Sequence, residues 1–101
     1  MNDNLSWLKG SIPPLITPFR DGAVDFKTYA RLIERQIEGG SHGILVNGTT
    51  SEPSTLTTDE RNELVALAVK TAKGRIPVVA ATGSQSLAET LVLSQFAEKA
   101  G

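Results

Sequence analysis

Residues 43–57, Gly-Ile-Leu-Val-Asn-Gly-Thr-Thr-Ser-Glu-Pro-Ser-Thr-Leu-Thr, decide the fold class of this chain. They begin with an apolar run, residues 43–47, that has too little polarity for a half-solvated strand and is typical of a buried parallel strand. A long polar loop follows, and Thr57 and Glu60 then have the spacing of a capping box that begins a helix. A strand, a loop and a helix in this order form one unit of a parallel α/β fold.

A unit of the same kind precedes this stretch. An apolar strand is predicted at residues 10–16, and residues 21–22 supply a turn after it. Asp25 is a plausible N-cap for the helix that follows, and the glycines at residues 39–40 end that helix. The spacing of its apolar side chains predicts one buried face, which consists of Phe26, Tyr29, Ile33 and Ile37.

A third unit follows the second. The second helix is expected to run to about Lys73, with Gly74 as its C-cap, and a third strand is predicted at residues 75–80. Ser86 and Glu89 have the spacing of another capping box, so a third helix should begin there and reach Ala100. Its predicted inward-facing apolar residues are Leu91, Val92 and Phe96.

The three predicted strands recur with a regular period. Ile12, Ile44 and Ile76 stand at equal intervals, close to the ~31 residues per unit that ~250 residues in eight units imply for a barrel. A doubly wound sheet has similar unit lengths, so the period alone favours neither architecture. The fold class is therefore α/β, and the choice between the two rests on the loops.

Composition excludes several classes of function. The chain has 101 residues, 40% of them hydrophobic, a net charge of −1 and no cysteine. Its charges are interspersed, which argues against nucleic acid or an anionic membrane as a partner. With a single histidine and no cysteine, we expect no metal site and no disulfide framework. The first ten residues lack the apolar run of a signal peptide, so we expect a soluble protein, and the lack of cysteine is compatible with the cytoplasm.

Chemistry in a parallel α/β fold collects where the strands end, which here means residues 17–19, 47–55 and 81–85. Only the middle segment is rich in reactive groups. The hydroxyls and successive backbone N–H groups of Thr49 and Thr50 are suited to holding a carboxylate and passing a proton. The alternative is a polar loop in which both threonines only bond the local backbone.

Residues 48–57 resemble the Gly-Thr-Thr-Gly-Glu-Ser-x-Thr-Leu signature of the dihydrodipicolinate synthase and N-acetylneuraminate lyase family. Residues 16–19 are similar to the end of that family's first strand, and residues 74–83 to its third strand and loop. With three matches in order, the chain is identified as a member of the family. The resemblance implies the first three β/α units of a (β/α)₈ TIM barrel, with residues 1–101 as the N-terminal portion of a single barrel domain whose remaining units are absent.

The resemblance also implies a function. The family consists of lyases in which pyruvate forms a Schiff base with a lysine on the sixth strand and a carbon–carbon bond to a second, aldehyde substrate is made or cleaved. The leading specific case is 4-hydroxy-tetrahydrodipicolinate synthesis in lysine biosynthesis, in the cytoplasm, by a homotetramer and without a cofactor. Thr49 and Thr50 match the residues that bind the pyruvate carboxylate, and Thr49 also matches the threonine of a proton relay with two tyrosines.

Two residues depart from the family signature. Ser51 stands where glycine is usual and Pro53 where synthases commonly have serine, so we expect the loop to differ in shape, because serine adopts a positive φ less readily than glycine. Glu52 either anchors the loop or is simply exposed. The lysine-feedback site of some synthases corresponds to four positions at which three of the family's residues are replaced, which argues against feedback: Thr58, Arg61, Gln85 and Glu89.

The chain carries five lysines, and none of them follows a predicted strand: Lys9, Lys27, Lys70, Lys73 and Lys99. We therefore expect the chain alone to be inactive, since a Schiff-base lysine needs a partly desolvated site. Tyr29 is expected in the core and His42 at a strand entry. Two other readings stay open, namely a small α/β module that holds a carboxylate or phosphate at residues 48–50 and a self-associating segment with open strand edges.

Overall fold

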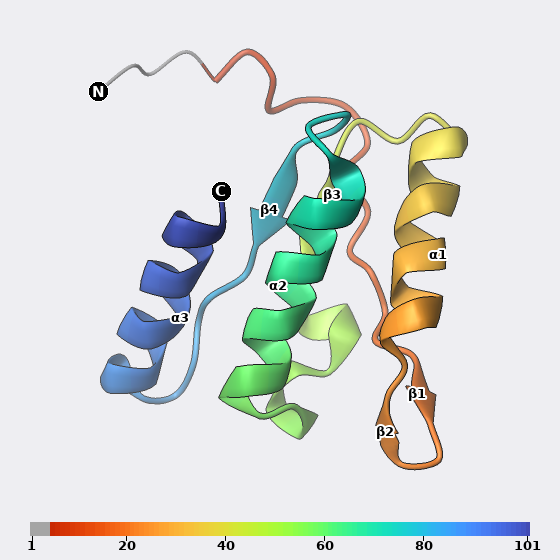
Figure 1. Ribbon diagram of the computed structural model, residues 1–101. Helices are drawn as coiled ribbons and strands as arrows, with labels where there is room; N and C mark the ends of the chain where they lie inside the picture. Colours follow the sequence, from red (N-terminus) through yellow and green to blue (C-terminus); the bar gives the residue numbers. More distant parts are fainter. Residues whose placement is uncertain (1–4) are drawn as a thin grey trace.

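Three helices lie side by side in chain order and cover the strands in the computed structural model, which describes residues 5–101 (Figure 1). They are α1 (Phe26–Glu38), α2 (Thr58–Ala72) and α3 (Leu87–Ala100). The molecule measures 35 × 32 × 20 Å, and its shortest dimension fits one layer of helices on one layer of strands.

The strand layer is parallel. β3 (Ile44–Val46) pairs with β4 (Val78–Ala80), with Ile44 opposite Val78. The segment at residues 10–16 runs beside the other edge of β3, where Leu45 donates its N–H to Pro13 O at 3.0 Å and accepts the Leu15 N–H at 3.0 Å. It forms only a bridge at Pro14 instead of the predicted strand, because two successive prolines cannot donate to a ladder. Three parallel segments thus lie in the order expected of three β/α units.

A short hairpin separates the first segment from α1. β1 (Phe19–Arg20) pairs antiparallel with β2 (Ala23–Val24) around Asp21 and Gly22. Both turn residues have positive φ, 52° and 81°, which is the backbone of the tightest hairpin turns. The predicted turn is confirmed, whereas the two strands beside it had no signal in the sequence.

The helix starts follow the predicted caps. The Asp25 carboxylate accepts the Thr28 N–H at 3.0 Å and the Thr28 hydroxyl at 2.7 Å, and these two bonds lower the pKa of Asp25. The capping box of α2 is complete, with Thr57 N–H donating to Glu60 at 2.8 Å and Glu60 N–H donating to Thr57 Oγ1 at 3.0 Å. At the other end of α2, the C-cap is Lys73, in a left-handed conformation, one residue before the glycine that was predicted.

The core lies between the helices and the strands. Tyr29 and Ile33 of α1 are fully buried, as their spacing predicted, and they meet Ile44 and Val46 of β3. Burial raises the pKa of the Tyr29 phenol, which is a core residue as expected. The other buried members of this cluster are Leu15, Val24, Leu64, Val65 and Ala68.

The predicted inner face of α3 is wrong for Leu91 and Val92, whereas Phe96 is half-buried. Leu91 and Val92 are 52% and 50% exposed, and the buried residue is Leu93. Ala97 and Ala100 are the α3 residues that pack against the main core. The helix is apolar around much of its first half, so hydrophobicity alone did not select the face, and small residues let α3 approach its neighbour. Its N-cap is Ser86, as predicted.

Candidate functional site

The three segments that follow the strands meet at one end of the strand layer. Thr17 donates its hydroxyl to Ser51 O at 2.8 Å, which joins the first segment to the loop after β3. Arg61, in the first turn of α2, donates to Ala81 O and Gly83 O of the loop after β4. The predicted loops are therefore brought together, and the residues that join them are ones to which the sequence reasoning gave no joining role.

Asn47 ends β3 and turns the chain into the loop. It is 2% exposed, has φ 64°, and its side-chain amide donates to Arg61 O at 3.0 Å. Its Oδ1 atom is buried and has no hydrogen-bond partner among residues 5–101. The signal that could have found it is an amide directly after an apolar strand, since Asn tolerates the left-handed conformation better than most residues.

The two threonines form the exposed part of the loop. They begin η1 (Thr49–Ser51), a single 3-10 turn whose N-cap is the extended Gly48. Both are exposed, and within residues 5–101 neither hydroxyl makes a hydrogen bond, so these threonines do not merely bond the local backbone. Their hydroxyls are free to meet a ligand.

Ser51 and Glu52 have contrasting environments and backbone conformations. Ser51 is fully buried inside the turn, and the positive φ, 57°, falls on Glu52. The replacement of glycine by serine therefore introduces no left-handed serine. η2 (Pro53–Thr55) starts directly after Glu52, which is exposed and whose carboxylate has no hydrogen-bond partner in the described part of the chain. Of the two alternatives for Glu52, the exposed one describes this structure.

Arg61 connects the end of β3 to the loop after β4. It is 5% exposed, and its two terminal nitrogens donate to Gly83 O and Ala81 O, each at 3.0 Å. Its Nε atom is buried without a partner among residues 5–101. Arg61 belongs to α2 and binds two carbonyls of the loop after β4, so these bonds couple the loop to the helix.

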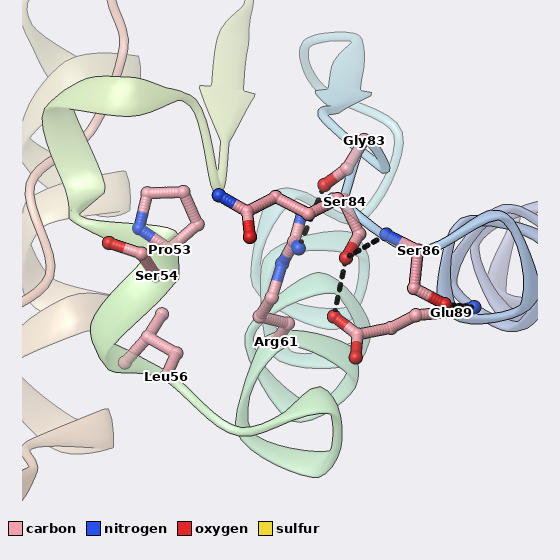
Figure 2. Close-up of a pocket in the computed structure, with 9 residues that line it drawn as sticks. Pro53, Ser54, Leu56, Arg61, Gly83, Ser84, Ser86 and Glu89 are labelled. Carbon is pink, nitrogen blue, oxygen red and sulfur yellow. Dashed lines mark hydrogen bonds between the residues drawn. The ribbon is translucent and has the colours of Figure 1, made fainter.

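A cavity of about 620 Å³ opens between the two loops (Figure 2). Figure 2 shows Pro53 and Leu56 on one side and Ser84, Ser86 and Glu89 on the other, with the Ser84 hydroxyl donating to the Glu89 carboxylate at 2.7 Å. Three of the four positions compared with a feedback site line this cavity: Arg61, Gln85 and Glu89. Thr58 is not among the lining residues, and Thr49 and Thr50 lie outside the cavity as well.

Other candidate chemistry is absent from the described residues. All five lysines are exposed, and each lies on a helix surface or in a connecting segment. Residues 5–101 hold no group of three or more side chains suited to a metal ion. His42 accepts the Ser11 N–H on Nδ1 at 2.9 Å beside the entry to β3, which is the structural role expected for it. In the part of the chain that the structure describes, no helix has the length and apolar character needed to span a membrane.

The arrangement of strands, helices and loop has a match among protein families. The model of the dihydrodipicolinate synthetase family matches residues 7–101. The chain belongs to the dihydrodipicolinate synthetase family. The 4-hydroxy-tetrahydrodipicolinate synthase of Thermus thermophilus is 50% identical over 93 residues, which are 92% of this chain and 31% of that enzyme. This chain therefore spans about a third of the length of the curated relatives it matches.

Solved structures of family members show the same fold. A dihydrodipicolinate synthase from Aquifex aeolicus matches with a TM-score of 0.88 and 44% identity, over 91% of this chain and 31% of that one. An N-acetylneuraminate lyase from Mycoplasma synoviae matches with a TM-score of 0.91 and 27% identity, over 96% of this chain and 34% of that one. The fold is thus the N-terminal third of a (β/α)₈ barrel, which confirms the prediction and excludes the doubly wound alternative.

Proposed function

We propose that this chain supplies the first three β/α units of a pyruvate-dependent lyase that works through a Schiff base, as the N-terminal portion of a single barrel domain. The observation that carries the proposal is the turn at the end of β3. There, Thr49 and Thr50 are exposed and their hydroxyls make no hydrogen bond within residues 5–101. Active sites of (β/α)₈ barrels are built from the loops at this end of the strands.

Each threonine has a chemical role in this proposal. The carboxylate of pyruvate accepts hydrogen bonds from the hydroxyls and backbone N–H groups of Thr49 and Thr50, which fix the orientation of the keto acid. A hydroxyl alone is a poor acid or base at neutral pH, so Thr49 acts as one member of a proton relay. The other members are two tyrosines that the remaining part of the enzyme provides, one of them from a second subunit.

The proposed reaction is that of 4-hydroxy-tetrahydrodipicolinate synthase in lysine biosynthesis. A lysine of the sixth unit condenses with the keto carbon of pyruvate to an imine and releases water. The imine loses a proton from the pyruvate methyl group, and the resulting enamine attacks an aldehyde, whose oxygen takes up a proton. Attack of water or an amine on the imine then releases the product and restores the lysine. The scheme needs an amine and hydroxyls and no cofactor. We further propose a homotetramer in the cytoplasm, as the resemblance to the family implies.

On its own, the chain should be inactive. A Schiff-base lysine must lose its proton near neutral pH, which usually requires desolvation or a neighbouring positive charge. All five lysines of this chain are exposed. The chain should therefore bind the carboxylate end of pyruvate without forming a covalent adduct.

Borohydride trapping with pyruvate, followed by intact-mass analysis, tests the proposal. It is carried out on the chain alone and on the chain mixed with a polypeptide that supplies the fourth to eighth units of a relative. The expected result is an adduct only in the mixture, and only on the added polypeptide. Replacing Thr50 by valine in this chain should lower the rate of trapping in the mixture, because valine keeps the shape of threonine and removes its hydroxyl.

Two outcomes would contradict the proposal. Stoichiometric labelling of the isolated chain would place the reactive amine among its own five lysines. A mixture that assembles by size measurement but traps no pyruvate would remove the assignment of the Thr49 and Thr50 turn to a keto acid.

A further inference from the structure

Ser51 occupies the centre of the turn that carries the two threonines, at a position where the family signature has glycine. It is fully buried, and all of its polar groups are bonded. Its N–H and its hydroxyl both donate to Gly48 O, at 2.9 and 2.8 Å, and its C=O accepts the Thr17 hydroxyl at 2.8 Å. A glycine at this position would keep the two backbone bonds and lose the hydroxyl bond.

The turn needs such support because a residue in the left-handed conformation stands on each side of it. Asn47 and Glu52, one on each side of residues 48–51, are non-glycine residues with φ of 64° and 57°. This conformation is unfavourable for a residue such as Glu52 and persists only where the surroundings hold it, whereas asparagine adopts it more readily. At Asn47, the conformation is stabilised by the hydrogen bond that its side-chain amide donates to Arg61 O. Inside the turn, the stabilising contacts are the two hydrogen bonds that Ser51 donates to Gly48 O.

The direction of the threonine side chains depends on this backbone. Since the hydroxyls of Thr49 and Thr50 have no partner within residues 5–101, no hydrogen bond orients these side chains. Their direction therefore depends on the backbone of the turn. Thr17, 6% exposed, ties the turn to the first segment, so two of the three parallel segments contribute to its geometry.

We propose that Ser51 is a positioning residue, which holds Thr49 and Thr50 in the arrangement that receives a carboxylate by tying Gly48 to the buried Thr17. The identity of the ligand rests on the proposed function. The effect of Ser51 on the order of the turn is independent of that function.

The test measures two properties of the chain by NMR. The first is the backbone order of the Thr49 and Thr50 amides from nitrogen-15 relaxation, and the second is the dissociation constant of sodium pyruvate from the shifts of the same amides. Ser51→Ala removes the hydroxyl while keeping a Cβ atom. Thr17→Val removes the donor to Ser51 O and keeps the side-chain shape.

Both variants should lower the order parameters of Thr49 and Thr50 and weaken pyruvate binding about 3- to 10-fold, the loss expected for one net hydrogen bond. Ser41→Ala is the matched control, because the Ser41 hydroxyl also makes one hydrogen bond, to Gln36 at 2.7 Å, but lies before β3 at the opposite end of the strand. This control should leave the order of the turn and the pyruvate affinity unchanged, even if the chain is less stable.

The outcomes separate the two proposals. If the unchanged chain shows no pyruvate-dependent shifts and Ser51→Ala loosens the turn, the positioning role stands and the keto-acid assignment is wrong. If Ser51→Ala leaves the order of Thr49 and Thr50 as it was, or loosens the turn without weakening measurable binding, the positioning proposal is overturned. Thr17→Val decides by the same two criteria if Ser51→Ala does not fold.

Discussion

Arg61 shows how single residues connect the loops of the candidate site. Among residues 5–101, the hydrogen-bond partners of its guanidinium are backbone carbonyls, and no carboxylate pairs with it. A buried cation is costly unless hydrogen bonds replace the water that it loses. Here the two hydrogen bonds offset part of the cost of burying the guanidinium, and they also fix the loop after β4 at Ala81 and Gly83.

Replacing Arg61 by methionine should lower the free energy of unfolding by about 2–3 kcal/mol, because Ala81 O and Gly83 O lose charge-assisted hydrogen bonds. Urea denaturation followed by circular dichroism measures the change. Arg31→Met is the control, since Arg31 is exposed on α1 and its loss should change the stability by less than about 0.5 kcal/mol. Equal losses for both variants would show that Arg61 does not hold the loop.

Elements with a chemical start signal could be predicted, and elements that depend on their neighbours could not. Asp25, Thr57 and Ser86 each cap a helix as expected, because a cap depends on residues within one turn. The prediction of the buried face of α3 was wrong at Leu91 and Val92, because residues 91–93 are all apolar and only the contact with α2 selects among them.

In the candidate site, too, local features could be predicted and contacts between distant residues could not. The loop and its two threonines could be read from the order of residues along the chain. The bonds from Thr17 to Ser51 and from Arg61 to the loop after β4 join residues far apart in sequence, so no local pattern indicates them. The sequence also did not indicate that the positive φ of the loop falls on Glu52.

The corrected face of α3 can be tested with two leucines. Leu93→Ala should lower the free energy of unfolding by about 2–5 kcal/mol, because Leu93 is 4% exposed and its loss leaves a cavity. Leu91→Ala, at a position that is 52% exposed, should change it by no more than about 0.5 kcal/mol. Thermal or urea unfolding of the two variants makes the comparison. A larger loss for Leu91 would restore the face that the sequence suggested.

At the scale of the whole molecule, the strand layer has open sides. Among the described residues, β4 pairs with β3 on one edge and with no strand on the other. The first half of α3 also exposes Leu87 and Leu91, which are 77% and 52% accessible. Unpaired strand edges and exposed apolar side chains both favour association.

The chain should therefore associate with itself or with the rest of a barrel. Sedimentation velocity over a range of concentrations should show species larger than the monomer. The double variant Leu87→Lys and Leu91→Lys should shift the distribution toward the monomer, whereas Lys27→Glu, on the exposed surface of α1, should not. A chain that stays monomeric at all concentrations, with a cooperative unfolding transition, would favour the reading as a small independent module.

The bridge at Pro14 determines how far such association extends. Because Pro13 O and Leu15 N–H both point to Leu45, the backbone of Pro14 faces the opposite, outer edge. That edge presents a carbonyl at Pro14 but no donor, so it is a poor template for a further strand. A second copy of the chain can therefore pair with the free edge of β4, whereas the edge at Pro14 does not favour pairing with another copy. Stacking should end after a few chains, because Pro14 disfavours an indefinite fibre.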